Sequence, residues 1–376
     1  QFTNKGTFTW QTENALYLQN GADFDNQQVF EVQDTMALLN NGGPLSTFTN
    51  NSLLKVASGK TATVGTVHFV NNGTLLVDGT LNFNGGNATF NSGGVFTGPG
   101  IVAVNSNANF NGSIESTNLT LSSGAFVGTN AVMNGMVEWT GGYLQGTWEV
   151  GFGQALVVND GGTKFADGVA LVNKGVIAWK TGNALYLQNG ASLDNRGVFE
   201  VQTGMSLLNN GGALSTFDNS GTLRVAANQN ANVGTFAFVN TAGLIDVGTG
   251  ASLNFAGNNA TFNTGTQFKG AGVTMVTSNA TFNGAFDSQN LSLRAGALNG
   301  GNAELTGNAE FMGGSLQGSW TVGTGGTLNI REGGTRYLNS VTLTNNGLIN
   351  WQASNPIYFQ NGANVVNSGK IDLQSD

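Results

Sequence analysis

The stretch GTLLVDGTLNFNGGNATFNSGGVF, residues 73–96, decides the fold that we expect for this chain. Apolar and polar residues alternate over short runs, and Gly, Asn-Gly or Asn-Asn then interrupts the alternation. A period of two is typical of a β-strand, so Leu81 and Phe83 should point to one face and the asparagines beside them to the other. The stretch therefore predicts several short strands separated by tight turns.

The whole chain carries the same pattern, and it also repeats over a long period. ALYLQNGA at 15–22 returns at 184–191 and, changed to PIYFQNGA, at 356–363. Trp10 aligns with Trp179 near the start of the first two copies, and Trp148 later aligns with Trp320, so about three residues are inserted in the second copy. We predict long repeats over approximately 1–169, 170–341 and 342–376, the third being partial. No ten-residue stretch has a convincing helical period, and 58 glycines disfavour helices.

Many short strands at regular spacing fit a sandwich, a barrel or a solenoid. Two observations favour the solenoid: no linker or change of composition interrupts the chain, and the same residue types return in similar contexts, as stacked coils require. We therefore predict an all-β fold, one continuous parallel β-helix (β-solenoid) over 1–376. With roughly 20 residues per coil and about 4.8 Å per strand spacing, it would form an elongated rod of about 18 coils, on the order of 85 Å long. Right-handed crossovers are the expected hand.

Composition excludes several classes of function. The net charge is −8, and the 13 Lys and Arg residues are scattered singly, so we expect no nucleic acid partner. The absence of cysteine excludes disulfides and thiolate metal sites. No apolar run approaches the ~20 residues of a membrane helix, so we expect no membrane span. Because Gln1 opens directly into patterned sequence, we expect a removed signal peptide or an excerpt of a longer chain.

Three segments carry a resemblance to a known group of proteins: VNNGTLLVDGTLNFNGGNATFNSGGVFTGPGIVAVN at 70–105, EWTGGYLQGTWEVGFGQALVVN at 138–159 and LTNNGLINW at 343–351. They resemble the β-strand-repeat arrays of giant bacterial cell-surface proteins. They are also similar in style to filamentous haemagglutinin-type and autotransporter-passenger solenoids. The resemblance covers essentially the whole chain. It implies a parallel β-helix stalk or fibre outside the cell.

Candidate catalytic residues are few. His68 is the only histidine, and Ala237 replaces it in the second copy, so the repeated module does not need it. Paired carboxylates would suit a glycan-cleaving β-helix, and Asp23 and Asp25 would share one face of a strand. The second copy has Ser192 in place of Asp23, and the third copy has no acid at either position. We therefore expect no catalytic residue and no enzyme.

Two further sets of acids have simple structural interpretations. Glu31, Glu200 and Asp372 keep an acid in all three copies, which we interpret as a solvated outward position without nearby partners. Asp160 and Asp167 could suggest calcium, but the second copy loses the second acid, so we expect an exposed turn. We predict neither a metal nor a cofactor.

Sequon-like triplets begin at Asn72, Asn87, Asn118 and Asn290, and the high content of Asn, Ser and Thr produces most of them. Whether these asparagines carry glycans is left open, because it depends on the glycosylation machinery of the host cell.

Recurrent aromatic and asparagine residues mark structural positions of the repeat. We expect the aromatic residues to fill the interior, with a glycan-stacking platform as the alternative. Asparagines following strands can adopt the left-handed conformation of sharp corners or form amide ladders between coils. The positions are Trp10, Trp179, Trp351, Tyr17, Tyr186, Tyr358, Trp148, Trp320, Asn20, Asn189, Asn361, Asn26, Asn195 and Asn367.

The function predicted from the sequence is that of a noncatalytic extracellular structural protein, a stalk, fibre or adhesin segment of the bacterial cell surface. The expected partners are other copies of the chain or its own continuation, and surface glycans are a further possibility. Two alternatives stay open: a glycan-binding or glycan-cleaving β-helix, and an ice-binding solenoid, which would need a flat face of regular Thr rows. We find no Thr-x-Thr at constant coil spacing.

Overall fold

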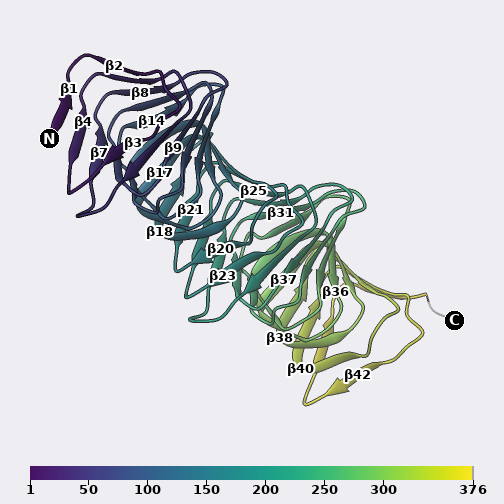
Figure 1. The fold of residues 1–376 in the computed structure, drawn as a ribbon. Coiled ribbons are helices and arrows are strands. Elements are labelled where there is room, and N and C mark those ends of the chain that lie inside the picture. The colour runs from purple at the N-terminus through teal and green to yellow at the C-terminus, as the bar shows by residue number, and fades with distance from the viewer. Residues whose placement is uncertain (375–376) are drawn as a thin grey trace. The chain divides into compact units, whose positions relative to one another are not determined.

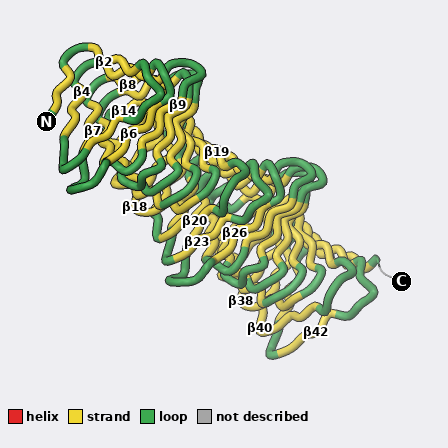
Figure 2. The backbone as a smooth tube through the Cα atoms, viewed as in Figure 1, coloured by secondary structure: helices red, strands yellow, loops and turns green. Residues whose placement is uncertain are grey.

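The computed structural model describes residues 1–374 and confirms the predicted fold class. Parallel strands stack as a β-solenoid of about 18 turns, and these residues contain no helix (Figure 1, Figure 2). The chain divides into two compact units, Gln1–Asn183 and Ala184–Asp376, here called unit 1 and unit 2.

The strands of unit 1 are mostly four residues long, except for three long ones near its end. They are β1 (Phe2–Asn4), β2 (Thr7–Trp10), β3 (Leu16–Leu18), β4 (Asp23–Asn26), β5 (Val29–Val32), β6 (Met36–Asn40), β7 (Thr47–Asn50), β8 (Leu53–Val56), β9 (Thr61–Val64), β10 (His68–Asn71), β11 (Thr74–Val77), β12 (Thr80–Phe83), β13 (Ala88–Phe90), β14 (Gly94–Thr97), β15 (Ile101–Val104), β16 (Ala108–Leu121), β17 (Ala125–Trp139), β18 (Gly142–Val150), β19 (Ala155–Val158), β20 (Lys164–Asp167), β21 (Ala170–Asn173) and β22 (Val176–Trp179).

The strands of unit 2 follow a similar succession of lengths, except that the ten-residue β40 stands where unit 1 has the two short strands β20 and β21. They are β23 (Leu185–Gln188), β24 (Ser192–Asn195), β25 (Val198–Val201), β26 (Met205–Asn209), β27 (Thr216–Asn219), β28 (Thr222–Val225), β29 (Asn230–Val233), β30 (Ala237–Asn240), β31 (Leu244–Val247), β32 (Ser252–Phe255), β33 (Ala260–Phe262), β34 (Gln267–Lys269), β35 (Val273–Val276), β36 (Ala280–Leu293), β37 (Ala297–Phe311), β38 (Gly314–Val322), β39 (Thr327–Ile330), β40 (Arg336–Asn345), β41 (Leu348–Trp351), β42 (Ile357–Gln360), β43 (Asn364–Asn367) and β44 (Lys370–Leu373).

Each turn of the solenoid contributes three strand segments, and each segment pairs in parallel with the equivalent segment of the next turn. The length of a turn is read from this register. A turn is long where Met36 pairs with Ala62 and much shorter where Val102 pairs with Leu119. The predicted length of roughly 20 residues lies between these two cases.

The interior is filled by every second residue of the strands, as the alternation predicts. Phe24, Phe48 and Phe69 lie on successive turns with ring centroids 4.8 and 5.6 Å apart and nearly parallel planes. Phe90 is fully buried. Such a column buries a large apolar area while each ring also contacts its neighbours above and below, which stabilises the register of the turns.

A second interior column consists of asparagine side chains at strand ends. Asn4, Asn26, Asn50 and Asn71 are linked by amide hydrogen bonds of 2.8 Å, each Nδ2 donating to the Oδ1 of the next turn. In unit 2, Asn195 donates to Asn219 and Asn219 to Asn240, both at 2.6 Å. An amide both donates and accepts, so it can be buried in a stack without an unpaired polar atom. Asn367 accepts from Asn345 at 2.7 Å and is itself exposed.

The other recurrent asparagines form corners of the coil. Asn20, Asn189 and Asn361 have φ of 56°, 54° and 54°, the left-handed region that the sequence predicts for them. All three are exposed and each is followed by Gly. The two sets of recurrent asparagines thus have different roles, one in the interior column and one at the corners.

The recurrent tryptophans lie inside or at the edge of the core. Trp179, Trp148 and Trp320 are buried, and the last two donate from Nε1 to the carbonyls of Gln145 and Gln317, at 2.9 and 3.0 Å.

Trp10 and Trp351 are half-buried, and each donates to a backbone carbonyl two residues further along the chain.

The tyrosines differ from the expected interior position. Tyr17 and Tyr358 are 56% and 50% exposed, and Tyr186 is half-buried. Leu18 and Leu187, next in the chain to Tyr17 and Tyr186, are buried, so alternation turns these tyrosines outward, where the phenol hydroxyl stays hydrated. Tyr358 packs against Tyr337 of the preceding turn, with ring centroids 5.6 Å apart.

Within unit 2, the third copy of the long repeat begins on a different face of the solenoid from the second. Strands β24 and β43 occupy equivalent positions in their copies, ending at Asn195 and Asn367. The pairing that leads to β43, however, starts from β25 and runs through β28, β31, β34, β36, β37, β38 and β40. The long period is therefore not a whole number of turns, and equivalent strands advance by one of the three faces per period.

Candidate functional site

The turns shorten in the same part of each unit, and we call this part the waist: residues 102–148 in unit 1 and 274–320 in unit 2. The pairs Val102↔Leu119 and Thr274↔Leu291 are closer together in the sequence than the pairs of the earlier turns. The corner loops are so short there that single strands, β16 and β36, run through several faces. Gly112 and Gly284, with φ of 71° and 69°, bend these strands where a side chain would be strained.

At the waist of unit 2 the surface is hollowed into a groove of about 400 Å³. Its lining is mainly polar and comes from four successive turns. The lining residues are Gly272, Val273, Gln289, Asn290, Leu291, Asn308, Ala309, Glu310, Thr327 and Asn329.

Unit 1 has a groove of about 290 Å³ at the equivalent place. Most of its lining residues are the long-repeat equivalents of residues that line the groove of unit 2, although Ile101 and Met136 replace Val273 and Asn308. The lining residues are Gly98, Pro99, Gly100, Ile101, Thr117, Asn118, Leu119, Thr120, Met136 and Glu138. Because the hollow recurs despite different side chains, it is the shortened turns that form it.

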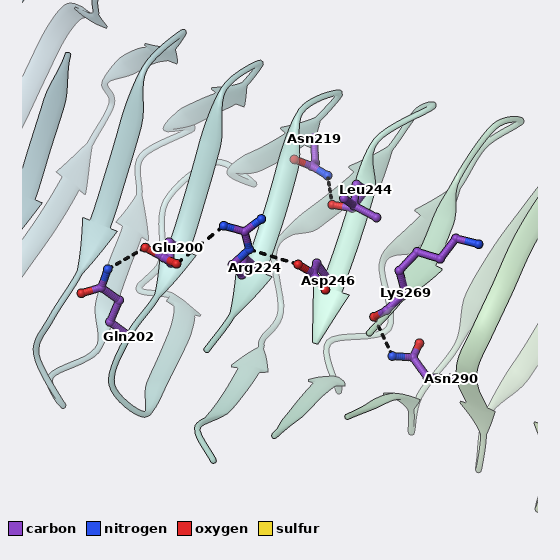
Figure 3. Close-up of polar contacts among 8 residues, drawn as sticks. All are labelled: Glu200, Gln202, Asn219, Arg224, Leu244, Asp246, Lys269 and Asn290. Carbon is purple, nitrogen blue, oxygen red and sulfur yellow. Dashed lines mark hydrogen bonds and ion pairs between the residues drawn. The ribbon is translucent and has the colours of Figure 1, made fainter. Parts of the chain in front are cut away.

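An asparagine anchors the floor of each groove. Asn290 donates from Nδ2 to the carbonyl of Lys269 at 2.7 Å (Figure 3). It also donates to the carbonyl of Gly270 at 3.3 Å. Asn118 donates to three carbonyls of the preceding turn, at 3.1 to 3.2 Å. The two sequon asparagines therefore hold successive turns together, and their amide nitrogens are already engaged.

The two anchors differ at the amide oxygen. Oδ1 of Asn290 lies 3.4 Å from Oγ1 of Thr274, a buried side chain. Unit 1 has Val102 at that position, and the buried Oδ1 of Asn118 has no hydrogen-bond partner among residues 1–374.

Each groove contains one carboxylate, and each carboxylate has a partner. Glu138 accepts hydrogen bonds from Asn159 and, at 3.2 Å, from Thr120. Glu310 lies 3.6 Å from Nε of Arg331. Each groove lining thus has a single paired carboxylate and not the two acids that glycoside hydrolysis uses.

In unit 2, charges of alternating sign follow one another on successive turns that lead into the waist. We call Glu200, Arg224, Asp246, Lys269 and Asp287 the charged row. Arg224 lies 3.8 Å from Glu200 and 3.0 Å from Asp246 (Figure 3). Lys269 pairs with Asp287. Cross-strand pairs of opposite charge favour the observed register.

The acid that recurs in all three copies has a cation partner each time, contrary to the expected solvated position without partners. Glu31 lies 3.0 Å from Lys55, Glu200 lies beside Arg224, and Asp372 lies 3.1 Å from Lys370. The hydrogen bond from Lys55 holds the pKa of Glu31 below its usual range. The sequence did not reveal these partners because the pairing of turns, and not sequence proximity, brings Lys55 and Arg224 to the acids.

The candidate catalytic residues lie on strands two turns apart, where His68 of β10 and Asp23 of β4 both pair with Thr47 of β7. His68 Nε2 lies 3.4 Å from Oγ1 of Thr89. Asp23 is exposed, and Asp25 accepts hydrogen bonds from Gln27 and Asn51, at 2.7 and 2.8 Å.

The candidate calcium ligands are also engaged elsewhere. Asp160 accepts from Thr181 and Asp167 from Gln145, both at 2.6 Å. Residues 1–374 contain no group of three or more His, Cys, Asp or Glu that could hold a metal ion.

Two features escaped prediction from the sequence. Burial raises the pKa of Asp218, and the charge of Asp194, its partner in the strand register, raises it further. Lys164 and Arg336 are fully buried cations at equivalent positions, and Arg336 donates to the carbonyls of Arg331 and Asn355, at 2.6 and 3.0 Å. Both features depend on which residues lie on adjacent turns.

Comparison with known proteins adds no relative: no protein-family model, no curated protein and no solved structure matches the chain. The described part of the chain has no helix with the length and apolar character needed to cross a membrane.

Proposed function

We propose that this chain is a noncatalytic structural protein outside the cell, forming a stalk, fibre or adhesin segment of a bacterial surface. The observation that carries the proposal is the stacking inside each unit. Backbone hydrogen bonds, phenylalanine rings and asparagine amides all continue from one turn to the next. A stack of this kind extends without limit by adding turns, which suits a spacer.

The noncatalytic part of the proposal is supported by the state of the ionisable groups. The recurrent acids are paired with cations, and the candidate calcium ligands accept hydrogen bonds from neighbouring side chains. The groove carboxylates Glu138 and Glu310 are single and partnered. Catalytic side chains need pKa values suited to proton transfer, and they must converge on one reacting atom. The contacts described here instead join side chains of neighbouring turns and stabilise the pairing of those turns.

The extracellular part of the proposal is supported by composition and by the resemblance to surface-protein arrays. Only 9% of the residues are charged and no cysteine is present. The outer surface is instead rich in amides linked between turns, as in the chain of hydrogen bonds from Asn72 to Asn51 and from Asn91 to Asn72, at 2.6 and 2.7 Å. Partners would be other copies of the chain or its own continuation.

The test is to label intact source cells with an antibody raised against the purified chain, before and after gentle protease treatment of the surface. We expect surface labelling that the protease removes, and electron micrographs showing fibres or stalks that carry the label. Labelling that requires permeabilised cells would disprove the proposed location. The purified chain incubated with polysaccharides should release no reducing ends, and their release would disprove the noncatalytic assignment.

A further inference from the structure

We propose that the waist groove of unit 2 is a binding site for a neutral oligosaccharide. The inference rests on the proposed function, because it supplies a surface stalk with a glycan partner. The first observation concerns the hydrogen bonds of the side chains that line the groove. Gln289 and Asn308 are exposed, and neither side chain has a hydrogen-bond partner among residues 1–374. Side-chain amides both donate and accept, which matches the hydroxyl groups of a sugar.

The next turn of the groove adds further hydrogen-bonding groups. Thr327 contributes a hydroxyl, and Asn329 accepts at Oδ1 from Nδ2 of Asn350 at 3.2 Å. That contact leaves Nδ2 of Asn329 as a donor. The four side chains come from three different turns. Asn308 pairs in register with Thr327, whereas Gln289 lies where the register of β36 and β37 shifts, between Ser288 and Leu291. The backbone of these strands is fixed by the stacking of the turns, so only the side chains have to be ordered when a ligand binds.

The charges of the groove indicate that the ligand is neutral. Glu310 is the only charged lining residue, and Arg331 partners it at 3.6 Å. No cation in the lining is available to bind phosphate, sulfate or carboxylate groups. A single partnered carboxylate also falls short of the several oxygen ligands that a divalent cation needs.

The size and the counterpart groove agree with a saccharide. A volume of about 400 Å³ lies within the range of small-molecule sites, roughly 300–1,000 Å³. In unit 1, Ile101 and Met136 are 53% and 48% exposed and replace two of the lining positions. That groove offers apolar contacts for the C–H faces of a sugar ring but fewer hydrogen bonds, so we expect it to be the weaker site.

The sequence of unit 1 suggests two substitutions in unit 2 that should leave its fold intact. Replacing Gln289 and Asn308 by their unit 1 counterparts, Q289T together with N308M, keeps residues that the same backbone already accommodates. N259A is the matched control, since Asn259 is an exposed asparagine of unit 2 outside the groove. Circular dichroism and thermal unfolding verify that all three proteins are folded.

The experiment is calorimetric titration of the full chain with cellohexaose, maltohexaose, laminarihexaose, mannohexaose and hexagalacturonate. We expect saturable binding of at least one neutral hexasaccharide, weakened about tenfold in Q289T/N308M because two hydrogen-bonding side chains are lost. N259A should bind like the wild type. The inference is overturned if no neutral hexasaccharide binds, if hexagalacturonate binds as tightly as the neutral ones, or if Q289T/N308M retains the wild-type affinity.

Failure of this inference is distinguishable from failure of the proposed function. Absence of binding removes the glycan partner and leaves the structural assignment intact. New reducing ends in the same samples would instead overturn the noncatalytic assignment, whatever the affinity.

Discussion

The amide of Asn118 shows how a single side chain can limit the stability of one turn. Its buried Oδ1 has no partner in the described chain, whereas the equivalent Asn290 has Thr274 beside it. Burying an acceptor without a donor costs roughly 1–3 kcal/mol. The two copies of the repeat therefore provide a natural pair for measuring that cost.

We predict that T274V lowers the free energy of unfolding by about 1 kcal/mol, because it recreates in unit 2 the unpartnered oxygen of unit 1. The converse change, V102T, gives Oδ1 of Asn118 a donor and should leave stability within about 0.5 kcal/mol of the wild type, or increase it. Denaturant titration followed by circular dichroism measures both. If T274V is as stable as the wild type, the contact between Thr274 and Asn290 contributes nothing.

Gly85 lies so close to the preceding turn that no side chain fits. A Cβ atom added to Gly85 would lie 1.3 Å from the carbonyl oxygen of Gly65, which is backbone and cannot rotate away. We expect G85A to destabilise unit 1 by at least about 2 kcal/mol through this overpacking. G182A is the control, since an added Cβ there meets nothing within 4 Å. Equal midpoints of thermal unfolding for the two variants would show that the turns are not packed this closely.

Asp218 should make stability depend on pH. Because burial, together with the charge of Asp194, raises the pKa of Asp218 in the folded chain, the folded state binds its proton more tightly than the unfolded state does. Wild-type stability should therefore fall, relative to D218N, as pH rises from below the unfolded pKa through the folded one. At neutral pH the difference should be complete, and D218N should be the more stable protein.

Denaturant titrations of both proteins at several pH values between 3 and 7 test this expectation. A difference between them that does not change with pH would contradict it. Arg196, which lies 2.6 Å from Asp194, stays charged over this range and does not contribute to the slope.

At the scale of the strands, one column of asparagine amides lies in the interior and another lies on the surface. Asn71 and Asn72 are neighbours in the chain and each joins a column of amides between turns. Asn71 is fully buried and accepts from Asn50 at 2.8 Å, whereas Asn72 accepts from Asn91 in the exposed column. The geometry of the bonds is similar, so burial is the main difference between the two positions.

We predict that N71A costs about 2 kcal/mol of unfolding free energy, because the amide of Asn50 loses its interior acceptor and a cavity remains. N72A should cost less than about 1 kcal/mol, since water replaces the lost partners. Denaturant titration of the pair provides the comparison. A similar loss of unfolding free energy in both variants would mean that the buried column stabilises the fold no more than the exposed one.

Alternation of apolar and polar residues was sufficient to predict the short strands, whereas the length of a turn was an assumption that the alternation did not supply. It could not predict the long strands of the waist, because β16 and β36 each pass one corner at a single glycine and the next at two polar residues, and both kinds of residue are common throughout the chain. The interior position expected for Tyr17 and Tyr186 was wrong, because alternation alone does not say which face of a strand is interior.

The groove was beyond prediction for a related reason. Gln289, Asn308 and Thr327 lie on successive turns and meet only through the register of β36, β37 and β39. In the sequence each of them is one polar residue among many. The same holds for the charged row, in which each member lies a full turn of the solenoid beyond the one before it. Interior positions follow from local pattern, whereas surface sites depend on turn lengths, which change along each unit.

For unit 2 as a whole, the advance of one face per long period means that equivalent residues of the repeat do not lie above one another. Asn195 and Asn367 hold equivalent positions in the second and third copies, yet their strands β24 and β43 belong to different faces of the solenoid. The long repeat therefore forms no continuous ladder of identical side chains on any face. A partner that contacts one face of unit 2 would meet different residues of the repeat from one copy to the next.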